Sequence, residues 1–176
     1  HGSHKLLSVQ HINQEELLEA KVTLNTSFNT GQIDSRIFSG FLEHLGRSIY
    51  GGVYDPGNDL SNEDGIRTDV AEDMAGMNMP CVRYPGGNFV SNYDWRDGVG
   101  SERKPFPDFA WKTTEPNTFG TDEFMKWCKL VGTEPMMAVN LGTLGPAAAA
   151  ALGEYCNLDT DTRWAQARRD NGSDKP

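Results

Sequence analysis

The 176-residue sequence is poor in cysteine and contains no long hydrophobic run. A helix that crosses a bilayer needs roughly 20 apolar residues in succession, and no stretch approaches that length. The three cysteines, Cys81, Cys128 and Cys156, are odd in number and far apart, so they fit neither a disulfide framework nor a metal site. We therefore expect three buried free thiols in a reducing compartment.

Positive charge is also scarce. Sixteen Lys and Arg stand against 25 Asp and Glu, which gives a net charge of −9 without a basic cluster. Nucleic acids and anionic membrane surfaces both attract basic faces, so neither is expected as a partner. Residues 1–4 resemble the remnant of an expression tag, and no secretory signal follows them, so the expected location is cytoplasmic.

Strand and helix patterns alternate along most of the chain. Apolar strands are predicted at residues 36–42, 79–84 and 134–140, and helices at 64–77, 121–131 and 146–156. Strands that are apolar throughout are typical of a parallel sheet buried on both faces. A doubly wound sheet and a (β/α)8 barrel both fit this order. The absence of a Gly-x-Gly-x-x-Gly dinucleotide motif favours the barrel weakly.

Finer features of the pattern give further expectations. The first helix should be capped by Asp64, and the second should start at the cap Thr121 and end at Gly132. Residues 22–28 alternate apolar and polar side chains, as a half-exposed strand does, whereas residues 89–117 read as irregular and 159–176 as a polar tail. The two predicted apolar helix faces comprise Ile66, Val70, Met74 and Met77 in the first helix and Phe124, Trp127, Cys128 and Val131 in the second.

The number of strand–helix units limits the architecture. A complete barrel takes about 250 residues, whereas only three βα units are present here. We therefore expect a fragment: residues 1–4 from a tag, 5–35 as an N-terminal segment, and 36–176 as the first part of an incomplete barrel.

Polar side chains follow the predicted strands at the rim where barrels bind ligands. A carboxylate, a guanidinium and amides together offer the donors and acceptors that sugar hydroxyls require. Trp111, in the long irregular segment, adds a ring on which a sugar face can stack. The candidate rim residues at the strand ends are Glu43, Arg83, Asn88 and Asn140.

Structural roles compete with these assignments. Glu43 can form a salt bridge to Arg83 or Arg47, and Asn140 can be a strand-end amide satisfied within the protein. His44 is more readily explained as a structural histidine than as a general base. No cluster of histidines, cysteines or carboxylates has the spacing of metal ligands, so neither a metal nor a cofactor is expected.

Several motifs in order resemble family 51 of the glycoside hydrolases, the α-L-arabinofuranosidases. The resemblance covers residues 22–164, nearly the whole chain. Its motifs are FLEHLGR at 41–47, IYGG at 49–52, VRYPGGNF at 82–89, YDWRDG at 93–98, WK at 111–112, EPNTFG at 115–120, AVNLG at 138–142 and EYCN at 154–157.

The resemblance implies a (β/α)8 barrel, with the N-terminal strand joining a β-sandwich, in a homo-oligomer that is commonly a hexamer. It implies a retaining hydrolase that removes terminal α-L-arabinofuranosyl residues from arabinan, arabinoxylan or derived oligosaccharides. Glu43, Arg83 and Asn88 would then hold the furanose and Trp111 would line the leaving-group side. The acid/base and nucleophile glutamates are expected beyond Pro176, so none of the residues present is assigned as catalytic.

Two other functions stay open from the sequence. An endoglucanase or β-xylosidase of the same clan would have similar rim residues. A non-catalytic sugar-binding fragment is the alternative outside enzymes, because both catalytic carboxylates are expected elsewhere.

Overall fold

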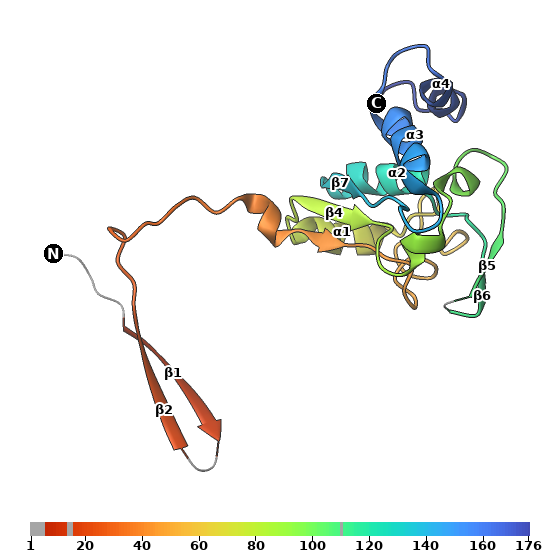
Figure 1. Ribbon diagram of the computed structural model, residues 1–176. Helices are drawn as coiled ribbons and strands as arrows, with labels where there is room; N and C mark the ends of the chain where they lie inside the picture. Colours follow the sequence, from red (N-terminus) through yellow and green to blue (C-terminus); the bar gives the residue numbers. More distant parts are fainter. Residues whose placement is uncertain (1–5, 14–15, 110) are drawn as a thin grey trace. The chain divides into compact units, whose positions relative to one another are not determined.

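The computed structural model describes residues 6–13, 16–109 and 111–176, and the chain divides into two compact units, His1–Asp34 and Ser35–Pro176 (Figure 1). The first unit contains an antiparallel hairpin of two strands, β1 (Leu6–Asn13) and β2 (Glu16–Thr23). Residues 24–34 follow without helix or strand.

The strand predicted for residues 22–28 is therefore wrong beyond Thr23. The side chain of Asn25 accepts a hydrogen bond from the Ser27 N–H at 2.9 Å. Such a local turn offers the backbone an alternative to pairing with a neighbouring strand. The apolar side chains of the segment, Phe28 among them, are exposed, so the alternation marks no buried face in this unit.

The second unit is built on a parallel sheet of three strands in the order β3-β4-β7. The strands are β3 (Gly40–Phe41), β4 (Cys81–Tyr84) and β7 (Glu134–Met137). The helices are α1 (Thr68–Gly76), α2 (Thr121–Val131), α3 (Gly145–Asn157) and α4 (Arg163–Asp170), as labelled in Figure 1. Strand order in the sheet follows the chain, with α1 and α2 as crossovers, which confirms the predicted α/β class.

Short elements occupy the connections. Segment 89–117, predicted to be irregular, contains two 3₁₀ helices and an antiparallel hairpin. These elements are η2 (Phe89–Asn92), η3 (Trp95–Gly98), β5 (Phe106–Asp108) and β6 (Thr113–Glu115), and a further 3₁₀ helix, η1 (Ser35–Phe38), precedes β3.

The main core lies between the sheet and helices α1 and α2. Val82 and Tyr84 of β4 are buried in it together with Phe124 and Trp127 of α2. The Tyr84 and Phe124 rings stack with their centroids 4.6 Å apart. Because side chains alternate along a strand, Arg83 points to the opposite face of the sheet, away from these helices.

Helix α2 follows its predicted pattern closely. It ends at Gly132, which has a left-handed φ of 79°, as expected. Its N-cap is Gly120 rather than Thr121, because the Glu123 side chain accepts the Gly120 N–H at 2.8 Å and caps the first turn. The whole predicted apolar face is buried, namely Phe124, Trp127, Cys128 and Val131.

Helix α1 starts later than predicted. It begins at Thr68, and Asp64 does not cap it but pairs with Lys126 of α2. Of the predicted apolar face, Ile66 is buried and Val70 and Met74 pack against the core, whereas Met77 is 63% exposed just beyond the last turn.

The outer strands differ from the prediction in length and burial. Residues 36–42 and 134–140 form only short strands, β3 and β7, and β7 is largely exposed rather than buried on both faces. Both lie at the edges of the described sheet, so each has a neighbouring strand on one side only.

The polar tail contains a helix that periodicity does not reveal. Helix α4 is held by Arg168, which is buried and donates to the carbonyl oxygens of Tyr155 and Leu158, both at 2.8 Å. A buried guanidinium with several carbonyl partners replaces the apolar contacts that a sequence pattern would show.

The three cysteines are free, as predicted. Cys81 and Cys128 are buried as predicted, whereas Cys156 is partly exposed, so the prediction of burial is wrong for this thiol. Burial raises the pKa of the Cys128 thiol to about 12. None of the helices in the described ranges is long and apolar enough to cross a membrane.

Phe124→Ala should destabilise the protein by about 3–5 kcal/mol, because it leaves a cavity between α2 and Tyr84. Leu130→Ala on the same helix is the matched control, since Leu130 is 47% exposed whereas Phe124 is fully buried. Urea unfolding of both variants measures the difference. Equal losses of unfolding free energy would show that α2 does not pack as described.

Candidate functional site

Four of the five predicted binding residues come from the carboxyl ends of the parallel strands. Glu43 lies just after β3, Arg83 within β4, Asn88 in the loop after β4, and Asn140 after β7. Ligands of parallel α/β proteins bind at this edge of the sheet. The shared edge therefore makes these side chains candidates for one site.

Glu43 and Arg83 form an ion pair between neighbouring strand ends. Arg83 Nη2 donates to Glu43 Oε1, and the Leu42 N–H donates to the Arg83 carbonyl oxygen at 2.8 Å. The guanidinium also lies over the Phe41 ring, 5.5 Å from its centroid. The Glu43 side chain is 17% exposed and that of Arg83 38%. The salt-bridge alternative for Glu43 is thus real, yet both side chains keep surface that a ligand could contact.

Two glycines enclose this ion pair. Gly86 and Gly87 both have a φ of +61°, a conformation that L residues with side chains rarely adopt. A Cβ at Gly87 would lie 2.5 Å from Glu43 Oε2, and one at Gly86 would lie 2.3 Å from Arg83 Nη1. The loop after β4 therefore approaches the ion pair at two positions where an added Cβ would force the ends of the Glu43 and Arg83 side chains to shift.

A second, buried pair joins His44 to Glu115. The His44 Nδ1 atom lies 3.2 Å from Glu115 Oε2, and the two side chains are only 5% and 8% exposed. On the other side of the ring, His44 Nε2 lies 3.1 Å from the Tyr84 hydroxyl. The ring also stacks on Phe89, with centroids 3.9 Å apart. Both ring nitrogens have a polar neighbour, which supports the structural role of His44.

Further donors hold the Glu115 carboxylate. The Tyr50 hydroxyl donates to Oε1, and the Asn117 N–H donates to the same oxygen at 2.9 Å. Burial by itself would raise the pKa of Glu115, but His44, Tyr50 and the Asn117 N–H outweigh it and lower that pKa below its usual value. Burial and the adjacent carboxylate raise the pKa of Tyr50 well above its ordinary value. Glu115 is therefore an anion held by its donors.

A pocket of about 400 Å³ opens beside this buried pair. His44, Tyr50 and Glu115 contribute to its lining, and Trp111 of the β5–β6 hairpin lines it too. The Trp111 side of the hairpin is accessible, since this residue is 49% exposed. The Trp111 N–H donates to the Asp108 side chain at 3.2 Å, which fixes the hairpin end. An exposed indole beside a polar floor is suited to stacking on a sugar ring.

Asn88 and Asn140 differ in exposure and in the hydrogen bonds that their side chains already make. Asn88 is exposed at the start of η2, where its side chain makes no capping hydrogen bond. Asn140 is 8% exposed and its amide makes four hydrogen bonds, to Tyr93, Gly142 and, twice, Thr143. Four bonds use the full capacity of an amide side chain. Asn140 therefore matches the alternative of a strand-end amide satisfied within the protein.

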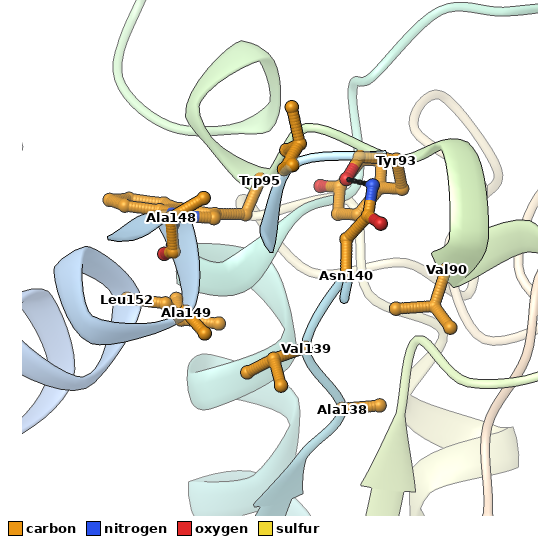
Figure 2. Close-up of a pocket in the computed structure, with 10 residues that line it drawn as sticks. Val90, Tyr93, Trp95, Ala138, Val139, Asn140, Ala148, Ala149 and Leu152 are labelled. Carbon is orange, nitrogen blue, oxygen red and sulfur yellow. Dashed lines mark hydrogen bonds between the residues drawn. The ribbon is translucent and has the colours of Figure 1, made fainter. Parts of the chain in front are cut away.

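Figure 2 shows the surroundings of Asn140, with the dashed bond to Tyr93. The cavity next to it measures only about 10 Å³, which is too small for a sugar ring. Apolar side chains make up most of its lining, among them Val90, Val139 and Leu152. This part of the sheet edge is packed rather than open to a ligand.

Sequence reasoning missed the connection between His44, Tyr50 and Glu115. Glu115 belongs to the motif at 115–120, but nothing in that motif indicates its partners. Tyr50 and Glu115 are 65 positions apart, and only the folded chain brings them together. Within the described ranges, no group of three or more His, Cys, Asp or Glu side chains is placed to hold a metal ion.

A parallel sheet with an ion pair at its carboxyl edge and a pocket bordered by Trp111 defines an α/β protein with a candidate ligand site at its strand ends. A family model described as "Alpha-L-arabinofuranosidase 1 domain" matches residues 73–176. The chain belongs to this family, and the resemblance to the family 51 enzymes is confirmed.

Individual relatives agree with this assignment. The "Intracellular exo-alpha-(1->5)-L-arabinofuranosidase" of Acetivibrio thermocellus is 49% identical over 160 residues, which are 90% of this chain and 32% of the relative. "Alpha-L-arabinofuranosidase C" of Emericella nidulans is 48% identical over 157 residues, covering 88% and 31% of the two chains. The chain thus spans about a third of the length of these relatives.

A solved structure gives the same result for the fold. The α-L-arabinofuranosidase of Thermotoga maritima, in a structure described as an arabinose complex, superposes with a TM-score of 0.77 at 47% identity. The superposition covers 79% of this chain and 29% of that one.

Gly87→Ala should destabilise the protein more than Gly57→Ala. Both glycines have positive φ, which costs about 1–2 kcal/mol for a residue with a Cβ. A Cβ at Gly57 has no atom within 4 Å, whereas one at Gly87 collides with Glu43. Chemical denaturation of the two variants measures the difference. A loss at Gly87 no greater than that at Gly57 would mean that the loop does not enclose Glu43.

Proposed function

We propose that this chain is the substrate-holding part of a retaining α-L-arabinofuranosidase that removes terminal arabinofuranosyl residues from arabinan, arabinoxylan or derived oligosaccharides. The observation that carries the proposal is the Glu43–Arg83 ion pair, enclosed by Gly86 and Gly87 at the carboxyl edge of the sheet, in a chain of this family. The names of the related enzymes support the choice of sugar.

We further propose that β3, β4 and β7 are the first three strands of a (β/α)8 barrel. The consecutive strand order and the exposure of β7 at the sheet edge support this architecture. Residues 36–176 would then form an incomplete barrel, residues 5–35 would contribute to a β-sandwich, and residues 1–4 would derive from a tag. In a barrel, the face of β4 opposite the helices is the interior, so Arg83 would point towards the barrel axis.

Each binding residue has a distinct role in this proposal. Glu43 accepts hydrogen bonds from furanose hydroxyls, and Arg83 and the exposed Asn88 donate to ring or hydroxyl oxygens. Trp111 stacks on the leaving-group side. Asn140 supports the loop after β7 through its four hydrogen bonds instead of reaching the sugar.

The bond is broken by two carboxylates that a part of the protein outside this sequence supplies. One attacks the anomeric carbon while the other protonates the leaving oxygen, and water then hydrolyses the covalent arabinosyl-enzyme with retention. In retaining enzymes these carboxylates stand about 5–5.5 Å apart. Glu43 is not proposed for either role, because its pairing with Arg83 suits it to holding the ring.

The proposed partners and cellular location of the protein follow from the same proposal. The partners are an arabinose-containing saccharide, the remainder of the same protein and further copies of it in a homo-oligomer, commonly a hexamer. The name of the Acetivibrio thermocellus relative includes the word intracellular, which supports a cytoplasmic location. No metal or cofactor takes part in the proposed double displacement.

Release of nitrophenol from an aryl α-L-arabinofuranoside by the complete protein tests the function. Turnover with retention of configuration is the expected result. Cleavage of an aryl β-xyloside or a glucan instead would move the protein to the β-xylosidase or endoglucanase alternative. Sugar binding without cleavage of any of these substrates would favour the non-catalytic alternative.

Glu43→Ala and Arg83→Lys should each lower kcat/KM by about 100-fold, because a misplaced ring loses its alignment for attack. Lysine cannot replace the planar fork of arginine at such a site. Arg96→Lys is the matched control, since Arg96 also pairs with a carboxylate, that of Asp94, but lies outside the sheet edge. Wild-type kinetics in Arg83→Lys would refute a fork-shaped contact with the sugar.

A further inference from the structure

We infer that His44 and Glu115 are positioning residues that hold the β5–β6 hairpin, and with it Trp111, against the segment that carries Glu43. The inference rests on the proposed function. It adds to that function the residues that determine where Trp111 lies on the leaving-group side. Neither residue needs to touch the substrate for this role.

The contacts of Glu115 join two distant segments at one carboxylate. Glu115 is the last residue of β6, and it is reached by His44 Nδ1 through Oε2 and by the Tyr50 hydroxyl through Oε1. His44 and Tyr50 both belong to the segment directly after β3, and His44 is the neighbour of Glu43. The contacts of Glu115 therefore fix the hairpin to the segment after β3, which also carries the proposed sugar-binding carboxylate Glu43.

The pair is built so that its geometry has little freedom. The His44 ring is held between Phe89, on which it stacks, and the Tyr84 hydroxyl. Tyr84 is itself fully buried, and its hydroxyl donates to the Phe119 carbonyl oxygen at 3.1 Å. Because both side chains are buried, removal of either one leaves the other without its polar partner in an environment with little water.

The hairpin depends on such an anchor. Strands β5 and β6 have three residues each, and a two-stranded hairpin is marginally stable alone. Its far end is exposed, with Phe109 at 80% and Trp111 at 49%. Within the hairpin, the Trp111 N–H is tied to the Asp108 carboxylate. A shift of Glu115 is therefore passed on to Trp111, while Phe106 keeps the base of the hairpin packed near Phe89.

Kinetics of the complete protein on an arabino-oligosaccharide provide the first test. Glu115→Ala should raise KM about 10-fold and change kcat by less than about 2-fold, because the loss falls on binding and not on the reacting ring. Glu115→Gln keeps the shape and the acceptor for Tyr50 but removes the charge beside His44, so its effect should be smaller. This second variant also serves if the alanine variant does not fold.

A double-mutant cycle with Trp111→Ala tests whether the effect passes through the indole. If Glu115 acts by placing Trp111, then adding Glu115→Ala to Trp111→Ala should raise KM no further. Full additivity of the two changes would overturn the inference.

Amide hydrogen exchange gives a readout that does not depend on activity. Peptides covering residues 106–117 should exchange faster in Glu115→Ala than in the wild type. Asp122→Asn is the matched control: Asp122 is also a largely buried carboxylate and accepts the Tyr155 hydroxyl at 2.7 Å, but it lies between α2 and α3. It should leave both the hairpin exchange and KM unchanged.

The results separate this inference from the proposed function. A fall in kcat with KM and hairpin exchange unchanged would show that the pair acts on the reacting ring, and the positioning role would be wrong. If the wild type cleaves no arabinofuranoside, the proposed function fails, while the exchange of residues 106–117 still decides whether His44 and Glu115 hold the hairpin.

Discussion

The alternation of side chains along β4 is the constraint on which both core and site depend. Val82 and Tyr84 face α1 and α2, and burial of these side chains fixes the strand on its helices. Arg83, between them, must then point to the other face of the sheet, where it meets Glu43. A slip of one residue in this strand would exchange the two sets and remove core and site together.

Tyr84 links the core to the segment that carries His44 through its hydroxyl. Its ring packs with Phe124, while its oxygen lies beside His44 and donates to the Phe119 carbonyl. Tyr84 therefore packs in the core with its ring and contacts His44 with its hydroxyl. Two side-chain pairs lie near it: the Glu43–Arg83 ion pair is partly exposed, whereas the His44 and Glu115 side chains are largely buried and border the pocket beside Trp111.

The sequence was most informative where a local pattern coincides with a packing face. The stripe of α2 and the glycine that ends it needed only the helical period. It was least informative for contacts made at a distance: α4 is fixed by the carbonyl contacts of Arg168, and the Tyr50–Glu115 bond spans 65 positions. At the site, the strand ends located Glu43 and Arg83, but nothing local could show that the amide of Asn140 is fully used within the protein.

The glycine pair after β4 also bears on which parts of the candidate site can change in sequence. A side chain at Gly86 or Gly87 would crowd Arg83 and Glu43 and would have to adopt a left-handed φ, so this loop tolerates little variation. The far end of the β5–β6 hairpin is exposed, with Phe109 at 80% and Trp111 at 49%, so its side chains meet fewer packing constraints. Sequence change is therefore easier to accommodate at the end of the hairpin than in the loop after β4.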